Sequence, residues 1–268
     1  MTLLLPSVAM SAARDVIHHT DLLTLCGTLG AASVDMILCD LPYGTTACSW
    51  DTVIPFEPMW QQFKRVIKPN RAIVLTASQP FTSKLTCSNF PMFRYEWIWI
   101  KRHGSNFLDV NRKPMKCHES ALVFSSGACI YYPQMREGTP YRCVTGSNTA
   151  NYGKFKRVES NNDGERYPLS VLQLNDEHGL HPTQKPVALF EYLIRTYTQP
   201  GDVVLDPCVG SGTTAVACRN LDRRYICGDS SAEYVAVARK RLQDTDPYQS
   251  TVLPTGDVQL SLFDSLAP

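Results

Sequence analysis

The chain has 268 residues, of which 44% are hydrophobic and 19% are charged. This is the composition of a folded globular protein with one large core, and it excludes fibrous and intrinsically disordered classes. The net charge of +1 at pH 7 favours no class of partner, so a nucleic-acid surface has to be recognised from local charge.

The first hundred residues contain short apolar runs separated by polar turns. The pattern predicts strands over residues 16–23, 34–39, 72–76 and 95–100 and a helix over residues 60–67. The run over 34–39 is almost purely apolar, which is typical of a parallel strand buried on both faces. It leads directly into the polar turn Asp40-Leu41-Pro42-Tyr43. We therefore expect this turn at the edge of a buried parallel sheet.

From residue 101 to residue 180 the apolar periodicity is weak. Between residues 101 and 170 there are eleven basic and six acidic residues, a local charge of +5. The aromatic residues that interleave with these charges include Tyr131, Tyr132, Tyr141, Tyr152, Phe155 and Tyr167. Basic residues mixed with aromatic residues are typical of a nucleic-acid surface. Lys154, Lys156 and Arg157 are the candidate phosphate contacts. On charge alone, an ordinary solvated insertion is an equally good interpretation.

Regular structure is predicted again after residue 181. Pro186 suits the first turn of a helix whose apolar face carries Leu189, Leu193 and Tyr197. Further elements are then expected in the order strand 203–205, loop 206–212, helix 213–219, strand 224–227 and helix 233–242. This order predicts a βαβ unit that binds a nucleotide.

The loop of that unit has the sequence Asp206-Pro207-Cys208-Val209-Gly210-Ser211-Gly212-Thr213. Its glycines allow the backbone to approach a ligand closely. Asp229, 19 positions after Gly210, ends the next predicted strand and is suitably placed to bind two ribose hydroxyls. The loop also fits the dinucleotide pattern G-x-G-x-x-A, so on the loop alone an NAD-dependent oxidoreductase and a tight turn without a ligand both stay open.

The turn after the strand over 34–39 combines groups that could hold a base amine. The carboxylate of Asp40 and the backbone carbonyl of Leu41 are two acceptors for two N–H donors, and Pro42 restricts Leu41 to an extended conformation. The ring of Tyr43 could stack on the base. The alternative is a strand-ending turn in which Asp40 binds backbone amides and Tyr43 packs on the core.

Together, these motifs resemble those of the DNA amino-methyltransferases, and specifically their β class. In that class a D/N/S-P-P-Y motif comes first, a target-recognition region follows, and the cofactor loop comes last, as Asp40-Leu41-Pro42-Tyr43 and the loop from Asp206 do here. The H-P-T-Q-K-P motif of the family is complete at His181-Pro182-Thr183-Gln184-Lys185-Pro186. The string from Asp40 to Trp50 is similar to that of solitary enzymes carried by phages and prophages.

Two residues depart from the family pattern. Leu41 stands where a proline is usual, but the role there belongs to the backbone carbonyl. Cys208 stands where an aromatic residue is common, which is expected to loosen the packing against the cofactor.

The resemblance implies an α/β fold, a Rossmann-like seven-stranded sandwich of the S-adenosylmethionine-dependent methyltransferases with an inserted target-recognition region. The expected parts are a catalytic half over 1–100, the insertion over 101–180, a cofactor-binding half over 181–246 and a C-terminal tail over 247–268. It also implies a role for each part of the site: Asp40, Leu41, Pro42 and Tyr43 hold the base. The cofactor residues are Asp21, His181, Thr183, Lys185, Asp206, Pro207, Cys208, Gly210, Ser211, Gly212, Thr213 and Asp229.

Within that set, Asp229 is assigned to the ribose, and Thr183 and Lys185 to the methionine carboxylate. Asp21 is assigned to the cofactor adenine as the end of the first strand. The implied substrate is double-stranded DNA with the target base flipped out of the helix. The implied reaction is methylation of adenine N6 by direct transfer, without a metal and without a covalent enzyme intermediate.

Several alternatives stay open at this point. N4-cytosine methylation uses the same architecture, although a serine at the position of Asp40 is its usual mark. Methylation of RNA or of a small molecule, the oxidoreductase, and a catalytically dead DNA-binding relative are the others. A homodimer and a cognate restriction enzyme are both compatible with the resemblance. The ten cysteines contain no C-x-x-C pair and no apolar run is long enough to span a bilayer, so we expect reduced thiols, no zinc site and a cytoplasmic protein.

Overall fold

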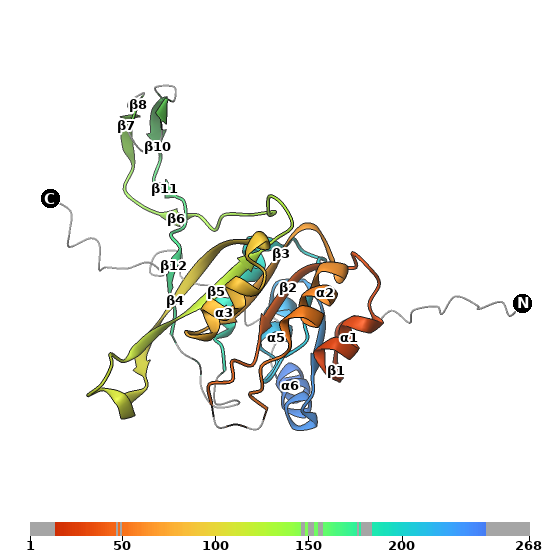
Figure 1. Cartoon of the computed structure of the whole chain (residues 1–268). Helices are drawn as coiled ribbons and strands as arrows, with labels where there is room; N and C mark the ends of the chain where they lie inside the picture. The colour runs from red at the N-terminus through yellow and green to blue at the C-terminus, as the bar shows by residue number, and fades with distance from the viewer. Residues whose placement is uncertain are drawn as a thin grey trace, which may run out of the picture.

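The structure is a computed structural model, and it describes residues 14–46, 48, 50–145, 148–149, 153–154, 158–175, 177 and 184–244. Its centre is an eight-stranded sheet in the order β1-β14-β13-β2-β3-β5-β4-β12 (Figure 1). The strands are β1 (Val16–His19), β2 (Val34–Asp40), β3 (Ile67–Ala77), β4 (Phe93–Ser105), β5 (Lys116–Phe124), β12 (Val171–Gln173), β13 (Val203–Asp206) and β14 (Arg224–Asp229).

Only β5 runs against the other strands of this sheet. It is antiparallel to β3 and to β4, and every other neighbouring pair is parallel. The predicted α/β class with a mostly parallel sheet is confirmed. The sheet has eight strands where seven were expected, because the short strand β12 adds to the edge beside β4.

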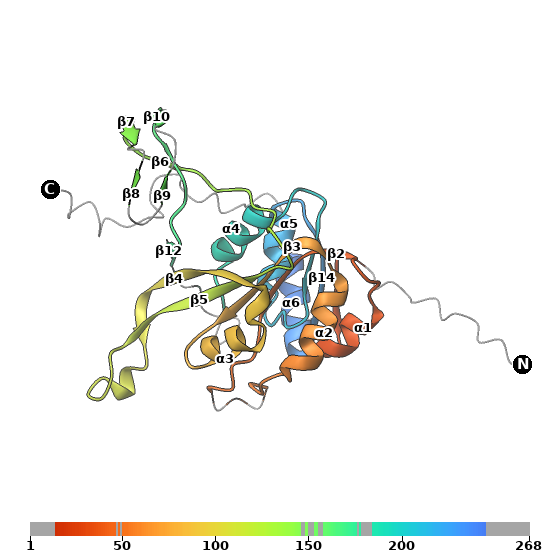
Figure 2. The ribbon, with the colours of Figure 1, turned by 45° about the horizontal axis from the view of Figure 1, so that its top comes forward.

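Helices cover both faces of the sheet (Figures 1 and 2). They are α1 (Leu22–Thr28), α2 (Phe56–Val66), α3 (Phe81–Ser88), α4 (Val187–Tyr197), α5 (Thr213–Asn220) and α6 (Ala232–Asp244). The alternation of β2 separates the two layers: Ile37 and Cys39 pack with α1, α2 and α3, whereas Met36 and Leu38 pack with α4 and α5. All four side chains are fully buried, as expected for a strand that is apolar along its length.

Two expectations about the chain's elements are wrong. The strand predicted over 16–23 ends at His19, because Asp21 caps α1: its carboxylate accepts the backbone amide of Thr24 at 3.0 Å. The predicted insertion over 101–180 contains β5 and β12, which belong to the central sheet. The part that leaves the sheet between β5 and β12, residues 125–170, is therefore shorter than expected, and we call it the arm.

The arm and the hairpin of β4 and β5 extend away from the sheet (Figure 1). The arm contains three two-stranded ladders, formed by β6 (Arg136–Glu137) with β11 (Glu165–Arg166), β7 (Tyr141–Thr145) with β10 (Val158–Asn162), and β8 (Asn148–Thr149) with β9 (Gly153–Lys154). The tip of the β4–β5 hairpin, residues 106–115, includes the 3-10 turn η2 (Phe107–Asp109). Within the described residues, no helix has the length and apolar character needed to cross a membrane.

Candidate active site

Acidic residues end three neighbouring parallel strands at the same edge of the sheet. They are Asp40 of β2, Asp206 of β13 and Asp229 of β14. Thr76 of β3 is paired in register with Asp40 and adds a hydroxyl beside it. Ligands of open α/β sheets bind at this edge. The topology therefore brings together the two motifs that are 166 positions apart in the sequence.

Asp40 is held from both sides. The hydroxyl of Tyr43 donates to Asp40 Oδ1 at 2.9 Å, and the hydroxyl of Thr76 donates to the same oxygen. The ammonium of Lys185 donates to the other oxygen, Oδ2, at 2.7 Å. The side chain of Asp40 is still 24% exposed, so a ligand can reach a carboxylate whose orientation is already fixed.

Lys185 connects Asp40 to a second carboxylate. Lys185 Nζ lies 3.3 Å from Glu119 Oε2, and the other oxygen of Glu119 binds the ammonium of Lys101. Burial alone would lower the pKa of Lys185, but Asp40 and Glu119 outweigh it and raise that pKa above its usual value. Burial would raise the pKa of Glu119, yet the two lysines hold it below its usual value. Lys185 and Glu119 are therefore both charged at neutral pH.

The ring of Tyr43 packs between apolar and charged neighbours. It stacks on Phe81 of α3 with 5.2 Å between ring centroids, and Lys185 Nζ lies 5.5 Å from its centroid. Burial raises the pKa of Tyr43 well above its usual value, so its hydroxyl stays neutral and donates to Asp40. Base stacking on Tyr43 stays a prediction.

The glycine-rich loop is held by the two acids that end β13 and β14. Asp206 is buried; it accepts the backbone amide of Cys208 at 3.1 Å and the hydroxyl of Thr214, and burial raises its pKa to about 7. Asp229 accepts the backbone amide of Gly210 at 2.9 Å and stays partly exposed. Because each carboxylate oxygen can accept more than one hydrogen bond, Asp229 can bind the loop and a ribose hydroxyl together.

Gly212 shows why the loop needs glycine. Its φ is +89°, and a Cβ there would lie 2.9 Å from the Cβ of Ala238 in α6. Next to it, the guanidinium of Arg241 donates to Thr213 Oγ1 at 3.1 Å, and Thr213 Oγ1 itself donates to the carbonyl of Lys185 at 3.2 Å. This loop follows β13 and opens α5, which is the position where open α/β sheets bind nucleotides.

The structure places the remaining predicted site residues in different surroundings, and some of them lie outside the residues it describes. Leu41, Pro207 and Ser211 are buried beside the site, and Pro42 is half-buried. Both carboxylate oxygens of Asp21 accept hydrogen bonds from Thr24, and Asp21 thereby caps α1. This geometry gives no support to a contact with the cofactor. His181, Thr183, Lys156 and Arg157 lie outside the described residues, and for Lys154 only the backbone, in β9, is described.

Three residues of the site were missed in the sequence: Thr76, Lys101 and Glu119. Glu119 was counted only as one acid of a basic insertion. The available signal was its place two residues before the apolar run Ala121-Leu122-Val123-Phe124, because a carboxylate beside a buried run has to find a charged partner.

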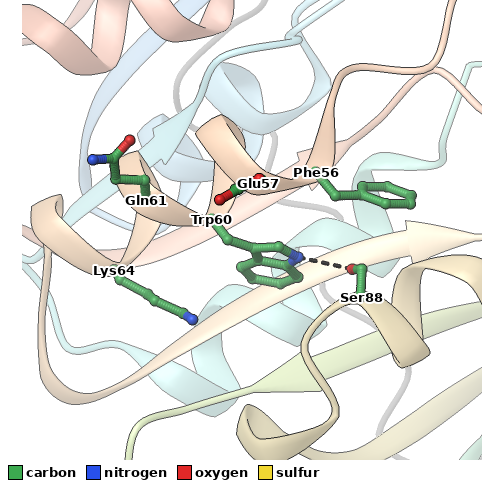
Figure 3. Close-up of a pocket in the computed structure, with 6 residues that line it drawn as sticks. All are labelled: Phe56, Glu57, Trp60, Gln61, Lys64 and Ser88. Atoms are coloured by element: carbon green, nitrogen blue, oxygen red, sulfur yellow. Dashed lines mark hydrogen bonds between the residues drawn. The ribbon is translucent and has the colours of Figure 1, made fainter.

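A separate pocket of about 620 Å³ lies between α2 and α3 and contains none of these residues (Figure 3). Its lining residues are Phe56, Glu57, Trp60, Gln61, Lys64 and Ser88. The indole N–H of Trp60 donates to Ser88 Oγ at 2.8 Å, so the polar edge of the indole is already satisfied. The chemistry therefore concentrates at the edge of the sheet and not in this pocket.

Residues 34–240 match the family model described as DNA methylase, of the N6/N4 methyltransferase type. The chain is 31% identical to the type II methyltransferase M.HpaI of Haemophilus parainfluenzae over 230 residues, which cover 78% of this chain and 68% of that protein. It is 26% identical over 259 residues to the DNA adenine methyltransferase YhdJ of Escherichia coli, with 90% and 86% covered.

Solved structures agree with this match. The crystal structure of M1.HpyAVI has a TM-score of 0.58 and 25% identity, covering 85% of this chain and 98% of that one. The cytosine-N4-specific PvuII DNA methyltransferase has a TM-score of 0.61 and 17% identity, with 90% of each chain covered, and this likeness shows the fold alone.

Proposed function

Because this chain belongs to the DNA methylase family of N6/N4 amino-methyltransferases, we propose that it methylates N6 of adenine at a specific DNA site. The observation that carries the proposal is the fixed, partly exposed carboxylate of Asp40 at the edge of the sheet. One N–H of the amine is bound by Asp40 and the other by the carbonyl of Leu41. These acceptors stabilise the positive charge that develops on the nitrogen.

The choice of adenine rests on Asp40. The related YhdJ is described as an adenine methyltransferase and the PvuII enzyme as cytosine-N4-specific, so relatives of both kinds share this architecture. A serine at the first motif position is typical of the cytosine enzymes, whereas this chain has an aspartate. The family match leaves the NAD-dependent oxidoreductase without support.

The cofactor we propose is S-adenosylmethionine, whose sulfonium supplies the methyl group. Asp206, Gly210 and Gly212 shape the loop that receives it, and Asp229 binds the ribose. Lys185 is held by Asp40 and Glu119, so we assign it to the amine site and not to the methionine carboxylate.

DNA contacts are proposed at two places. The tip of the β4–β5 hairpin exposes Phe107 (69%) and Leu108 (87%) beside the basic residues Arg112 and Lys113. Apolar side chains beside cations suit a duplex in which one base is flipped out of the helix. The apolar side chains can fill the space that the flipped base leaves in the stack, while the cations bind phosphates. The arm, with Lys154, Lys156 and Arg157, is the second place. If neutralising those three together leaves the salt dependence of DNA binding unchanged, the arm assignment is wrong.

The proposal is tested by incubating unmethylated duplex DNA with the protein and S-adenosylmethionine and analysing the nucleosides by mass spectrometry. We expect N6-methyladenine. N4-methylcytosine would keep the reaction but overturn the choice of base. A methylated base in RNA but not in duplex DNA would overturn the choice of substrate.

A further inference from the structure

Four charged side chains form a connected row at the amine site. Asp40 binds Lys185, Lys185 binds Glu119, and Glu119 binds Lys101. They come from four separate parts of the chain: β2, the segment before α4, β5 and β4. The charges along the row alternate in sign, so each charge is compensated by its neighbours at a place where little solvent can compensate it.

The burial of the row makes Lys185 depend on its partners. The exposed fractions of the side chains are 5% for Lys185 and 12% for Glu119. A lysine ammonium ends a flexible four-carbon chain, so its position is set by the groups it binds. Asp40 and Glu119 lie on either side of it, 2.7 and 3.3 Å away. The ammonium of Lys185 is therefore held between two carboxylates, of which Glu119 is the more buried.

The orientation of Asp40 depends in turn on Lys185. Tyr43 and Thr76 bind only Oδ1, whereas the bond that fixes Oδ2 comes from Lys185. If Lys185 moved, the carboxylate could rotate about its Cβ–Cγ bond, and the acceptor offered to the amine would change direction.

We propose that Glu119 is a positioning residue for the methyl-transfer site, acting through Lys185 on the carboxylate of Asp40. This inference rests on the proposed function. A purely structural role would not require this arrangement, because a buried ion pair is often no more stabilising than apolar residues of the same size. The row contributes geometry and a fixed charge at the place where the amine is held.

Glu119 also keeps Lys185 protonated. The groups that face Lys185 are the acids Asp40 and Glu119 and the ring of Tyr43, with Lys101 beyond Glu119. Without the charge of Glu119, burial would weigh more and the pKa of Lys185 would fall. Lys185 would then lose its proton, and its hold on Asp40 would weaken, at a less alkaline pH than in the wild type.

The test is the pH profile of DNA methylation by Glu119→Gln, with Glu119→Asp and Glu191→Gln measured beside it. We expect Glu119→Gln to lower kcat by about tenfold to a hundredfold, as misplacement of a reacting group does. The KM for S-adenosylmethionine should stay within about twofold, because the loop from Asp206 to Gly212 is untouched. The alkaline limb of the profile should move to lower pH.

The two other variants separate position from charge and from stability. Glu119→Asp keeps the charge but is shorter, so we expect a reduced kcat with the alkaline limb near its wild-type pH, and it carries the test if Glu119→Gln does not fold. Glu191 is a buried acid of α4 that pairs with Arg195 at 3.0 Å, outside the site. Glu191→Gln should lower the melting temperature without moving the alkaline limb.

Two results would overturn the inference in different ways. A folded Glu119→Gln protein with the kcat and pH profile of the wild type would show that Glu119 does not position the site. The same conclusion would follow if kcat fell only in proportion to a lower melting temperature while the pH profile stayed unchanged. A wild-type protein that methylates no base in DNA or RNA would remove the proposed function, and the positioning role with it.

Discussion

The carboxylate of Asp51 accepts the backbone amide of Gly44 at 2.8 Å and so closes the loop that follows the amine-binding turn. Its other oxygen accepts the amides of Thr45 at 2.8 Å and Thr46 at 2.7 Å and the hydroxyl of Thr46 at 2.8 Å. Four donors on one buried carboxylate fix the path of the chain directly after Tyr43.

Replacing Asp51 by asparagine should loosen this loop, because an amide has one acceptor oxygen and brings two donors of its own. We expect a loss of about 2 kcal/mol in the free energy of unfolding at pH 7, the size of a few charge-assisted hydrogen bonds. Urea denaturation measures it. An equal loss of stability in Asp222→Asn, an exposed acid after α5, would show that the effect is not specific to the loop.

The same variant gives a pH dependence with a defined sign. Burial would raise the pKa of Asp51, but the amides of Gly44, Thr45 and Thr46 and the hydroxyl of Thr46 hold it below its ordinary value of 3.8. A lowered carboxyl pKa contributes stability above pH 3.8 that is lost as the pH falls through the folded-state pKa. The stability gap between wild type and Asp51→Asn should therefore narrow in acid, and a constant gap would contradict this account.

Gly212→Ala should destabilise the cofactor loop more than Gly201→Ala does. Both glycines have positive φ, +89° and +84°, so both substitutions carry a backbone strain of about 1 kcal/mol or more. Only at Gly212 does the new Cβ meet a neighbour, Ala238 at 2.9 Å; at Gly201 nothing lies within 4 Å. We expect weaker binding of S-adenosylmethionine by calorimetry in Gly212→Ala alone. Equal effects of the two variants on the binding of S-adenosylmethionine would mean that α6 shifts and accommodates the new Cβ at Gly212.

Asp40→Ala removes the acceptor of the amine while the loop from Asp206 to Gly212 stays in place. Methylation should fall by about a hundredfold to a thousandfold, as when one oriented group that stabilises developing charge is lost. Binding of S-adenosylmethionine, measured by calorimetry, should be retained. Full activity in this variant would remove Asp40 from the mechanism.

The hairpin tip predicts a change in the salt dependence of DNA binding. Replacing Arg112 and Lys113 by alanine should reduce the slope of log K against log salt by about 1 for each phosphate that the protein no longer binds, and so by up to about 2. Fluorescence anisotropy at several salt concentrations measures this slope. The matched control replaces Lys64 of α2 and Lys240 of α6, two exposed lysines outside the hairpin. If both double variants have the same slope, the tip does not bind DNA.

The sequence predicted the elements whose burial is regular. The strand over 34–39 and the helix 213–219 are found within one residue as β2 and α5, because both are apolar along buried faces. The strand β5 was missed because it lies in a basic segment and only its second half is buried. β5 also pairs with β3, the strand before β4 in the chain, and pairing between strands that do not follow one another in the sequence has no local signal.

The residues of the site also differ in whether the sequence could predict them. Asp40 and Asp229 could be found because each ends an apolar strand, and the fold brings such ends together. Asp21 could not be distinguished from them, since an acid that caps a helix also follows a strand. Glu119 and Lys101 belong to the site only through cross-strand pairing of β4 and β5, which places residues 18 positions apart on one face.

The arm is tied to the sheet at both of its ends. Ser120 of β5 and Val171 of β12 pair with the same residue, Ile98 of β4, from opposite sides. The arm itself, residues 125–170, can therefore vary in length and sequence while the registers of β2 and β3, and with them Asp40, stay unchanged. The arm therefore has the connectivity of an exchangeable segment: its length and sequence can change while Tyr43, Thr76 and Lys185 keep their hold on Asp40.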